Sequence, residues 1–247
     1  MDAGAGPGRF TAALGGPGSR HRVALDLGRA MLAEFRDRPG VGQGATDPTE
    51  LVRGDAARSP FRDAAFGVVA ALGNLVGFAG ANEGRMLSEL MRLVAPGGTL
   101  ILEVAPGPGE HSRYLHRLPA SSVRRLLRSP PRAVAGRIER EGFDAEPRRK
   151  KDDGEFRRIS PGDLALELER QGFHVEERVA IAPALGSDRD RIAAVARDPK
   201  AWAHLLEVEE ALGRSPDRSS LAAAVLLAAV APPGGSPDRA GPKRRIK

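Results

Sequence analysis

Cysteine is absent from this 247-residue chain, and aromatic residues make up only 4% of it. Without cysteine the chain can form neither disulfides nor thiolate metal sites, while its redox compartment stays undecided. The five histidines are scattered, and neither paired carboxylates nor metal-ligand spacing is found. We therefore do not expect metal-assisted chemistry.

Long apolar runs are missing as well. The longest, residues 221–231, is too short to span a bilayer. The chain opens on a glycine-rich run instead of a signal peptide. We expect a cytoplasmic protein without a membrane span, and the length favours one α/β domain with insertions over two independent domains.

Positive charge is concentrated in one segment. Residues 111–160 hold 14 Lys and Arg against 7 Asp and Glu, a net charge of +7, so the rest of the chain sums to −1 of the total +6. Such a segment could cover a site for an anionic small molecule, or it could be an ordinary solvated surface. Only three aromatic side chains lie in it, so a platform for stacking nucleic-acid bases is weakly supported.

Strand-like and helix-like patterns alternate along the chain. Apolar or alternating runs predict strands at residues 22–27, 66–72, 99–104, 174–181 and 221–231, with strand-like pieces near 134–138 and 156–159. Helical periodicity and end signals predict helices at residues 30–35, 86–94, 121–128, 161–171 and within 189–212. This order implies a mostly parallel sheet with helices on both faces, which binds ligands at the carboxyl ends of its strands.

A glycine motif at the start of the chain carries the chemistry. Gly4, Gly6 and Gly8 alternate after Asp2, so the backbone can approach a ligand closely and present amide N–H groups to it. Asp26 follows Gly8 by 18 residues, at the end of the next predicted strand, where its carboxylate can accept both hydroxyls of a ribose. The motif and the acid together predict a nucleoside site.

The spacing resembles that of class I, Rossmann-like S-adenosylmethionine-dependent methyltransferases, whose motif begins with an acid and runs G-x-G-x-G. The segments at residues 93–100 (LVAPGGTL) and 171–175 (QGFHV) are similar to later signatures of that family. The resemblance implies a doubly wound α/β fold with an antiparallel late strand and a basic insertion after the fifth strand. It also implies S-adenosylmethionine as cofactor.

Carried over residue by residue, the resemblance assigns a cofactor site. Asp26 resembles the ribose-binding acid, Asp55 the acid that contacts the adenine amino group, and Asn74 a residue beside the methionine end. The complete set of implied cofactor-binding residues is Asp2, Gly4, Gly6, Gly8, Asp26, Leu27, Asp55, Ala56, Leu72 and Asn74.

The chain departs from the family at its start, where only Met1 precedes the glycine motif. Family members normally have a full central strand and preceding helices there, and the lack of that strand would leave backbone groups of its neighbours unsatisfied. We expect a methyltransferase-like domain over residues 1–231 that is truncated at its N-terminus. Residues 106–160 would form its basic insertion or lid, and residues 232–247 a disordered basic tail.

The acceptor cannot be read from the sequence. Glu103 and Glu110 bracket the loop after the strand predicted at residues 99–104, which is the fifth strand in the family's order. His111, Tyr114 and His116 are close behind, and each of these residues could act as a base or be a surface residue. The catalytic residues and the oligomeric state stay open. The expected function is methyl transfer to a small molecule. The alternatives are an inactive methyltransferase-like binding or scaffold protein and a nicotinamide-dependent oxidoreductase, which the glycine spacing disfavours.

Overall fold

The computed structural model describes residues 1–14, 21–38, 49–105, 120–141, 159–182, 189–214, 222 and 224–234. Their seven strands form one sheet in the order β3-β2-β1-β4-β5-β7-β6. The strands are β1 (Asp2–Ala3), β2 (Arg22–Asp26), β3 (Thr49–Arg53), β4 (Phe66–Ala71), β5 (Val94–Val104), β6 (His174–Ile181) and β7 (Ala224–Val230). β7 runs antiparallel to both β5 and β6, and the other described strand pairs are parallel. The doubly wound, mostly parallel α/β fold with an antiparallel late strand is confirmed.

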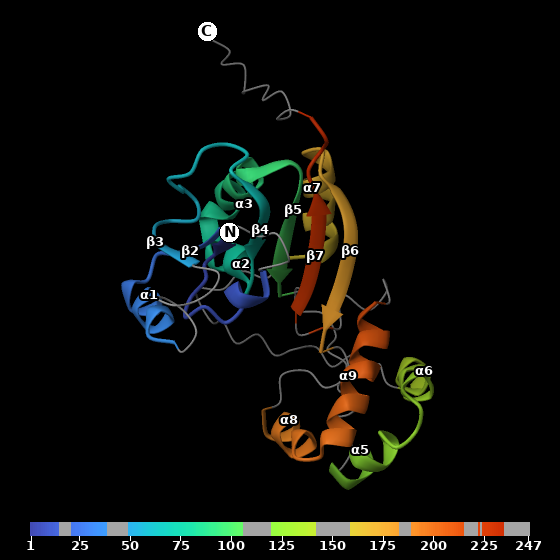
Figure 1. Cartoon of the computed structure of the whole chain (residues 1–247). Helices are drawn as coiled ribbons and strands as arrows, with labels where there is room; N and C mark the ends of the chain where they lie inside the picture. The colour runs from blue at the N-terminus through green and yellow to red at the C-terminus, as the bar shows by residue number, and fades with distance from the viewer. Residues whose placement is uncertain are drawn as a thin grey trace.

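Helices cover both faces of the sheet and one of its ends (Figure 1). The α-helices are α1 (Arg29–Arg36), α2 (Leu75–Phe78), α3 (Glu83–Leu93), α5 (Ala120–Leu126), α6 (Pro131–Glu141), α7 (Pro161–Arg170), α8 (Arg189–Ala196) and α9 (Pro199–Gly213). Two short 3₁₀ helices are η1 (Thr11–Leu14) and η2 (Gly80–Asn82). None of the helices in the described part of the chain combines the length and apolar character needed to cross a membrane.

The capping signals act as expected in α7. The hydroxyl of Ser160 accepts a hydrogen bond from the Asp163 N–H at 3.3 Å, and Pro161 occupies the first turn. Gly172 ends the segment with a φ of +84°, which a side chain would oppose. Leu164 and Leu168 are buried on one face and join the core of the sheet.

β1 is the shortest strand although it lies at the centre of the sheet. Its two residues pair in parallel with β2 and β4, and Met1 adds hydrogen bonds to the β4 backbone at Val68 (2.7 Å) and Ala70 (2.9 Å). Neither this strand nor β3 was among the strands predicted from the sequence. Pairing with β2 forms β3, since Arg22–Asp26 and Thr49–Arg53 match residue for residue.

Two expectations about secondary structure are wrong, one about the type of an element and one about where a strand begins. The prediction of strand-like structure near 134–138 fails because these residues belong to α6, where Val134, Ala135 and Ile138 form a buried helical stripe. The Pro96-Gly97-Gly98 turn is not outside the fifth strand: β5 begins at Val94, and the turn produces a register shift in its pairing with β4.

A second core lies apart from the sheet. Ten buried side chains of α5, α6, α8 and α9 and of the turn after α5 pack together there, and the His204 ring hydrogen-bonds the carbonyl of Leu127 at the end of α5. Figure 1 shows these four helices gathered at the end of the sheet toward which β5 and β6 run. Since the parallel strands share that direction, the helices lie at the carboxyl edge, where this fold binds ligands.

Candidate functional site

The glycine loop leaves β1 at this carboxyl edge. Gly4, Gly6 and Gly8 have φ values of +67°, +53° and +76°, a region that disfavours any side chain. At Gly8 a Cβ would lie 2.3 Å from the ring of Phe35, so the loop packs directly on α1. At Gly6 a Cβ would meet nothing within 4 Å, so this glycine borders open space.

The amides of the loop, however, donate within the protein. The Gly4 and Ala5 N–H groups donate to the carbonyl of Leu25 at 2.8 and 3.1 Å, and the Gly8 N–H donates to Ala5 at 2.9 Å. The Gly6 N–H donates to a carboxylate oxygen of Asp26 at 2.7 Å. The expectation that these N–H groups point at a ligand is therefore wrong, and the glycines provide close approach instead.

Asp26 joins the loop to the next strand. Its second oxygen accepts a hydrogen bond from the Gly28 N–H at 2.7 Å, so both oxygens are held by backbone donors and the carboxylate has a fixed orientation. Leu27 beside it is 66% exposed, and Met31 in the first turn of α1 is 41% exposed. A fixed carboxylate next to an uncovered apolar surface can hold a ribose and one face of a base.

Asp55 lies at the end of β3, the neighbouring strand. One of its carboxylate oxygens accepts a hydrogen bond from the Ala57 N–H at 2.8 Å, and the Gly54 N–H donates to the carbonyl of Asp26 at 3.0 Å. The side chain of Ala56 is buried in the core, so it could contact a ligand only through its backbone.

Asn74 lies after β4, in the left-handed region with a φ of +58°, and it is 5% exposed. Its Oδ1 accepts a hydrogen bond from the Ala105 N–H at 2.9 Å, whereas its buried Nδ2 has no partner among the described residues. A buried donor without an acceptor costs free energy. The Leu72-Gly73-Asn74 turn therefore offers an amide that an acceptor oxygen of a ligand can satisfy.

Asp2 is buried beneath the loop, with 2% exposure. Burial raises the pKa of its carboxyl group, which accepts a hydrogen bond from the hydroxyl of Thr11 at 2.6 Å. Burial also lowers the pKa of the neighbouring Met1 amino group to about 6. Sequence reasoning missed Thr11, which the turn of the loop brings back over β1.

Most of the candidate catalytic residues lie outside the part of the chain that the structure describes. His111, Tyr114, His116 and Glu110 lie outside the described residues. Glu103 is described: its carboxylate accepts a hydrogen bond from the Gly73 N–H at 3.0 Å, which places it at the carboxyl edge beside the Asn74 turn. Among the residues that the structure describes, no group of three His, Asp or Glu side chains could hold a metal ion.

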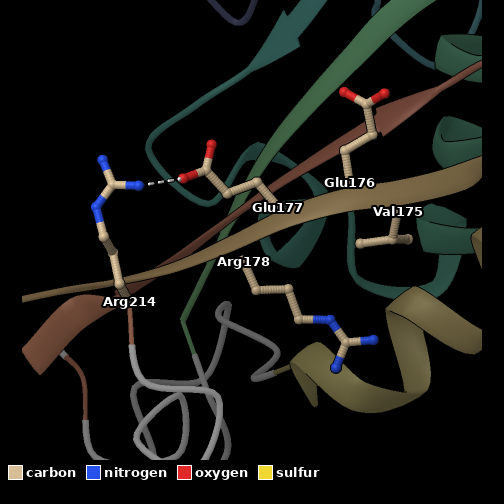
Figure 2. A pocket seen from close by; sticks show the side chains of 5 residues that line it. All are labelled: Val175, Glu176, Glu177, Arg178 and Arg214. Carbon is tan, nitrogen blue, oxygen red and sulfur yellow. Dashed lines mark hydrogen bonds and ion pairs between the residues drawn. The ribbon is translucent and has the colours of Figure 1, made fainter.

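A cavity of about 370 Å³ lies elsewhere, on the edge strand β6, and is lined by Val175, Glu176, Glu177, Arg178 and Arg214 (Figure 2). Arg214 pairs with Glu177 at 3.2 Å, and the ladder shifts register next to Glu176. Charges and a bulge are features that protect a sheet edge from pairing with another strand. β4, β5 and β7 separate this cavity from the glycine loop, so we do not place the site there.

Comparison with known proteins gives one family and many solved structures. Residues 1–102 match a family model described as "Methyltransferase domain". A search of curated proteins finds no match. The matched segment contains β1 through most of β5, and thus every cofactor-binding residue expected from the sequence.

Three structures illustrate the likeness. An S-adenosylmethionine-dependent methyltransferase from Mesorhizobium loti has 18% identity and a TM-score of 0.52, covering 93% of this chain and 88% of its own. A chain of the Haloferax volcanii complex between the Trm112 methyltransferase activator and a methyltransferase has 17% identity and a TM-score of 0.53, with 95% and 82% covered. The [4+2]-cyclase SpnF has 15% identity and a TM-score of 0.55, with 94% and 75% covered. At these identities the likeness concerns the fold.

Proposed function

We propose that this chain, whose residues 1–102 match the methyltransferase family model, is a class I methyltransferase that transfers a methyl group from S-adenosylmethionine to a small-molecule acceptor. One observation carries the proposal. The Gly6 N–H is bound to the carboxylate of Asp26, and open space lies where a Gly6 side chain would be. A ligand can thus approach the backbone next to the Asp26 carboxylate, whose fixed orientation suits the hydroxyls of a ribose.

The residues at the carboxyl edge fit this cofactor. The carboxylate of Asp26 would accept hydrogen bonds from the ribose hydroxyls. The exposed side chains of Leu27 and Met31 would contact the adenine ring. The second carboxylate oxygen of Asp55 would accept a hydrogen bond from the adenine amino group, since the first oxygen already accepts one from the Ala57 N–H. The unpartnered Nδ2 of Asn74 would donate to the methionine carboxylate.

S-adenosylmethionine, when bound, supplies a methyl group that its sulfonium has already activated. The protein then has to orient the acceptor, exclude water and, for acceptors that carry a proton, remove it. Glu103 is the described side chain placed to accept such a proton, because its carboxylate is fixed beside the Asn74 turn. The helices of the second core lie where they can cover the acceptor.

One feature supports an anionic acceptor. Arg125, Arg128 and Arg132 are exposed around the turn between α5 and α6, at the carboxyl end of the sheet. A positive potential there would attract an anion toward the cofactor site. Phosphorylated or carboxylated metabolites have that charge.

Calorimetric titration tests the cofactor assignment. We expect micromolar binding of S-adenosylmethionine and S-adenosylhomocysteine, and none of NADH. Gly6→Ala should cost about 1–2 kcal/mol because of the positive φ, but leave the chain folded, since a Cβ meets no atom within 4 Å. It should weaken binding at least about tenfold by filling the approach. Gly8→Ala should instead destabilise the fold through its clash with Phe35. Unchanged binding by Gly6→Ala, or preferential binding of NADH, would contradict the proposal.

A further inference from the structure

The loop between β3 and β4, residues 54–65, carries Asp55 near its start and is anchored at both ends. Its first anchor is the strand next to it, because the Gly54 N–H donates to the Asp26 carbonyl at 3.0 Å. The side chain of Ala57 is buried in the core, and its N–H fixes one carboxylate oxygen of Asp55. Asp55 itself is exposed, so its orientation depends on where the rest of the loop is held.

The second anchor is a pair of side chains on α3, Glu89 and Arg92, which we name the α3 brace. One oxygen of Glu89 accepts hydrogen bonds from both the N–H and the hydroxyl of Ser59, at 2.9 and 2.8 Å. The guanidinium of Arg92 donates to the carbonyl of Phe61 at 2.8 Å and to the carboxylate of Asp63 at 2.6 Å. Three positions of the loop are thus tied to one helix.

The α3 brace is also a rigid unit in itself. Arg92 donates through Nε and Nη2 to the two oxygens of Glu89, at 2.9 and 2.7 Å, in a two-pronged pairing. The side chains are only 14% and 16% exposed, so water screens the pair weakly. The pairing holds the pKa of Glu89 below its ordinary value and raises the pKa of Arg92. Both charges are therefore present across the pH range in which the protein would work.

We propose that Glu89 and Arg92 are positioning residues for cofactor recognition: by tying down the loop at Ser59 and Phe61, they hold Asp55 where its carboxylate can select the amino group of adenine. The inference rests on the proposed function and adds to it a determinant of base specificity outside the binding edge. Physically, Asp55 lies between two fixed points, the Gly54 bond to β2 and the Ser59 bonds to α3. Removing the Ser59 bonds to α3 frees the loop segment that carries Asp55.

Base discrimination tests the inference. The probes are S-adenosylhomocysteine and S-inosylhomocysteine, which differ in whether position 6 of the purine carries an amino group or a carbonyl oxygen. We expect the unmodified chain to prefer the first by more than about tenfold, since the second places an oxygen against the carboxylate of Asp55. Arg92→Ala should reduce the preference to within about threefold, and Asp55→Ala should do the same. Adding Asp55→Ala to Arg92→Ala should change it no further.

Several controls separate positioning from general stability. Arg214→Ala removes an arginine that, like Arg92, pairs with two carboxylates, here those of Glu177 and Glu210, but far from the loop, and it should keep the full preference. Arg92→Lys, which retains one charged donor, should restore part of it. If Arg92→Ala does not fold, Ser59→Ala tests the same anchor more gently. Both probes bind the same folded chain, so a loss of stability weakens their binding equally and leaves the ratio of their affinities unchanged.

Hydrogen exchange in the ligand-free chain supplies a second readout. The amides of Ala57 and Ser59 should exchange faster in the Arg92 variant than in the unmodified chain. An unchanged preference in foldable Arg92 and Ser59 variants would overturn the inference while leaving the proposed function intact. Equal affinity of the unmodified chain for both probes would also overturn it. Failure of the unmodified chain to bind either probe would refute the proposed function, and the inference with it.

Discussion

Replacement of Asp26 by alanine tests the centre of the proposed cofactor site. The carboxylate is held by the N–H groups of Gly6 and Gly28, each at 2.7 Å, and this leaves its remaining lone pairs for a ribose. A hydrogen bond to a charged group contributes about 1.5–3 kcal/mol, so loss of the ribose contact should weaken binding by about 10- to 150-fold. Gly6 and Gly28 also lose an acceptor, but water can reach these part-buried groups, and stability should fall by only about 1 kcal/mol.

Asparagine at the same position should not restore the affinity. Both carboxylate oxygens of Asp26 face backbone donors, so the amide NH₂ of Asp26→Asn would oppose one of two N–H groups. The assay is calorimetric titration with S-adenosylhomocysteine, with thermal unfolding to establish that each variant is folded. Asp37→Ala is the matched control, because Asp37 is an exposed acid at the other end of α1. A dissociation constant for Asp26→Ala within about twofold of the unmodified chain would refute the ribose assignment.

Two further predictions concern stability. Asp2→Asn should raise the free energy of unfolding at neutral pH, because burial raises the pKa of Asp2 and the ionised carboxylate opposes folding. That gain should shrink as the pH of a urea titration falls through the raised pKa toward the ordinary value of 3.8, and a pH-independent gain would contradict the cause. Gly213→Ala should cost about 1–3 kcal/mol in urea unfolding, because a Cβ would lie 2.4 Å from the carbonyl oxygen of Ala180. Its control, Gly84→Ala on the exposed face of α3, should instead stabilise by about 0.5–1 kcal/mol; equal effects would refute the role of close packing.

Local signals sufficed where the cause of structure is local. Ser160, Pro161 and Gly172 delimit α7 as expected, because an N-cap hydroxyl, a fixed φ and a left-handed glycine act within one turn. The glycine spacing and the distance to Asp26 were enough to predict that the loop and the acid lie together at the carboxyl edge, because in a parallel sheet consecutive βα units bring their carboxyl ends together. That this edge binds a nucleoside stays a prediction.

Other features depend on residues far apart in the sequence, and the tertiary structure decided them. The alternating apolar residues near Val134 read as a strand, yet packing against α9 makes them a helix. Thr11 reaches Asp2 only because the glycine loop turns back, and the α3 brace forms only because α3 packs beside a loop about thirty residues earlier. The sequence by itself determined the turns that form the proposed ligand site, since their causes are local. The packing of distant elements decided which side chains orient that site, because those contacts exist only once the sheet is assembled.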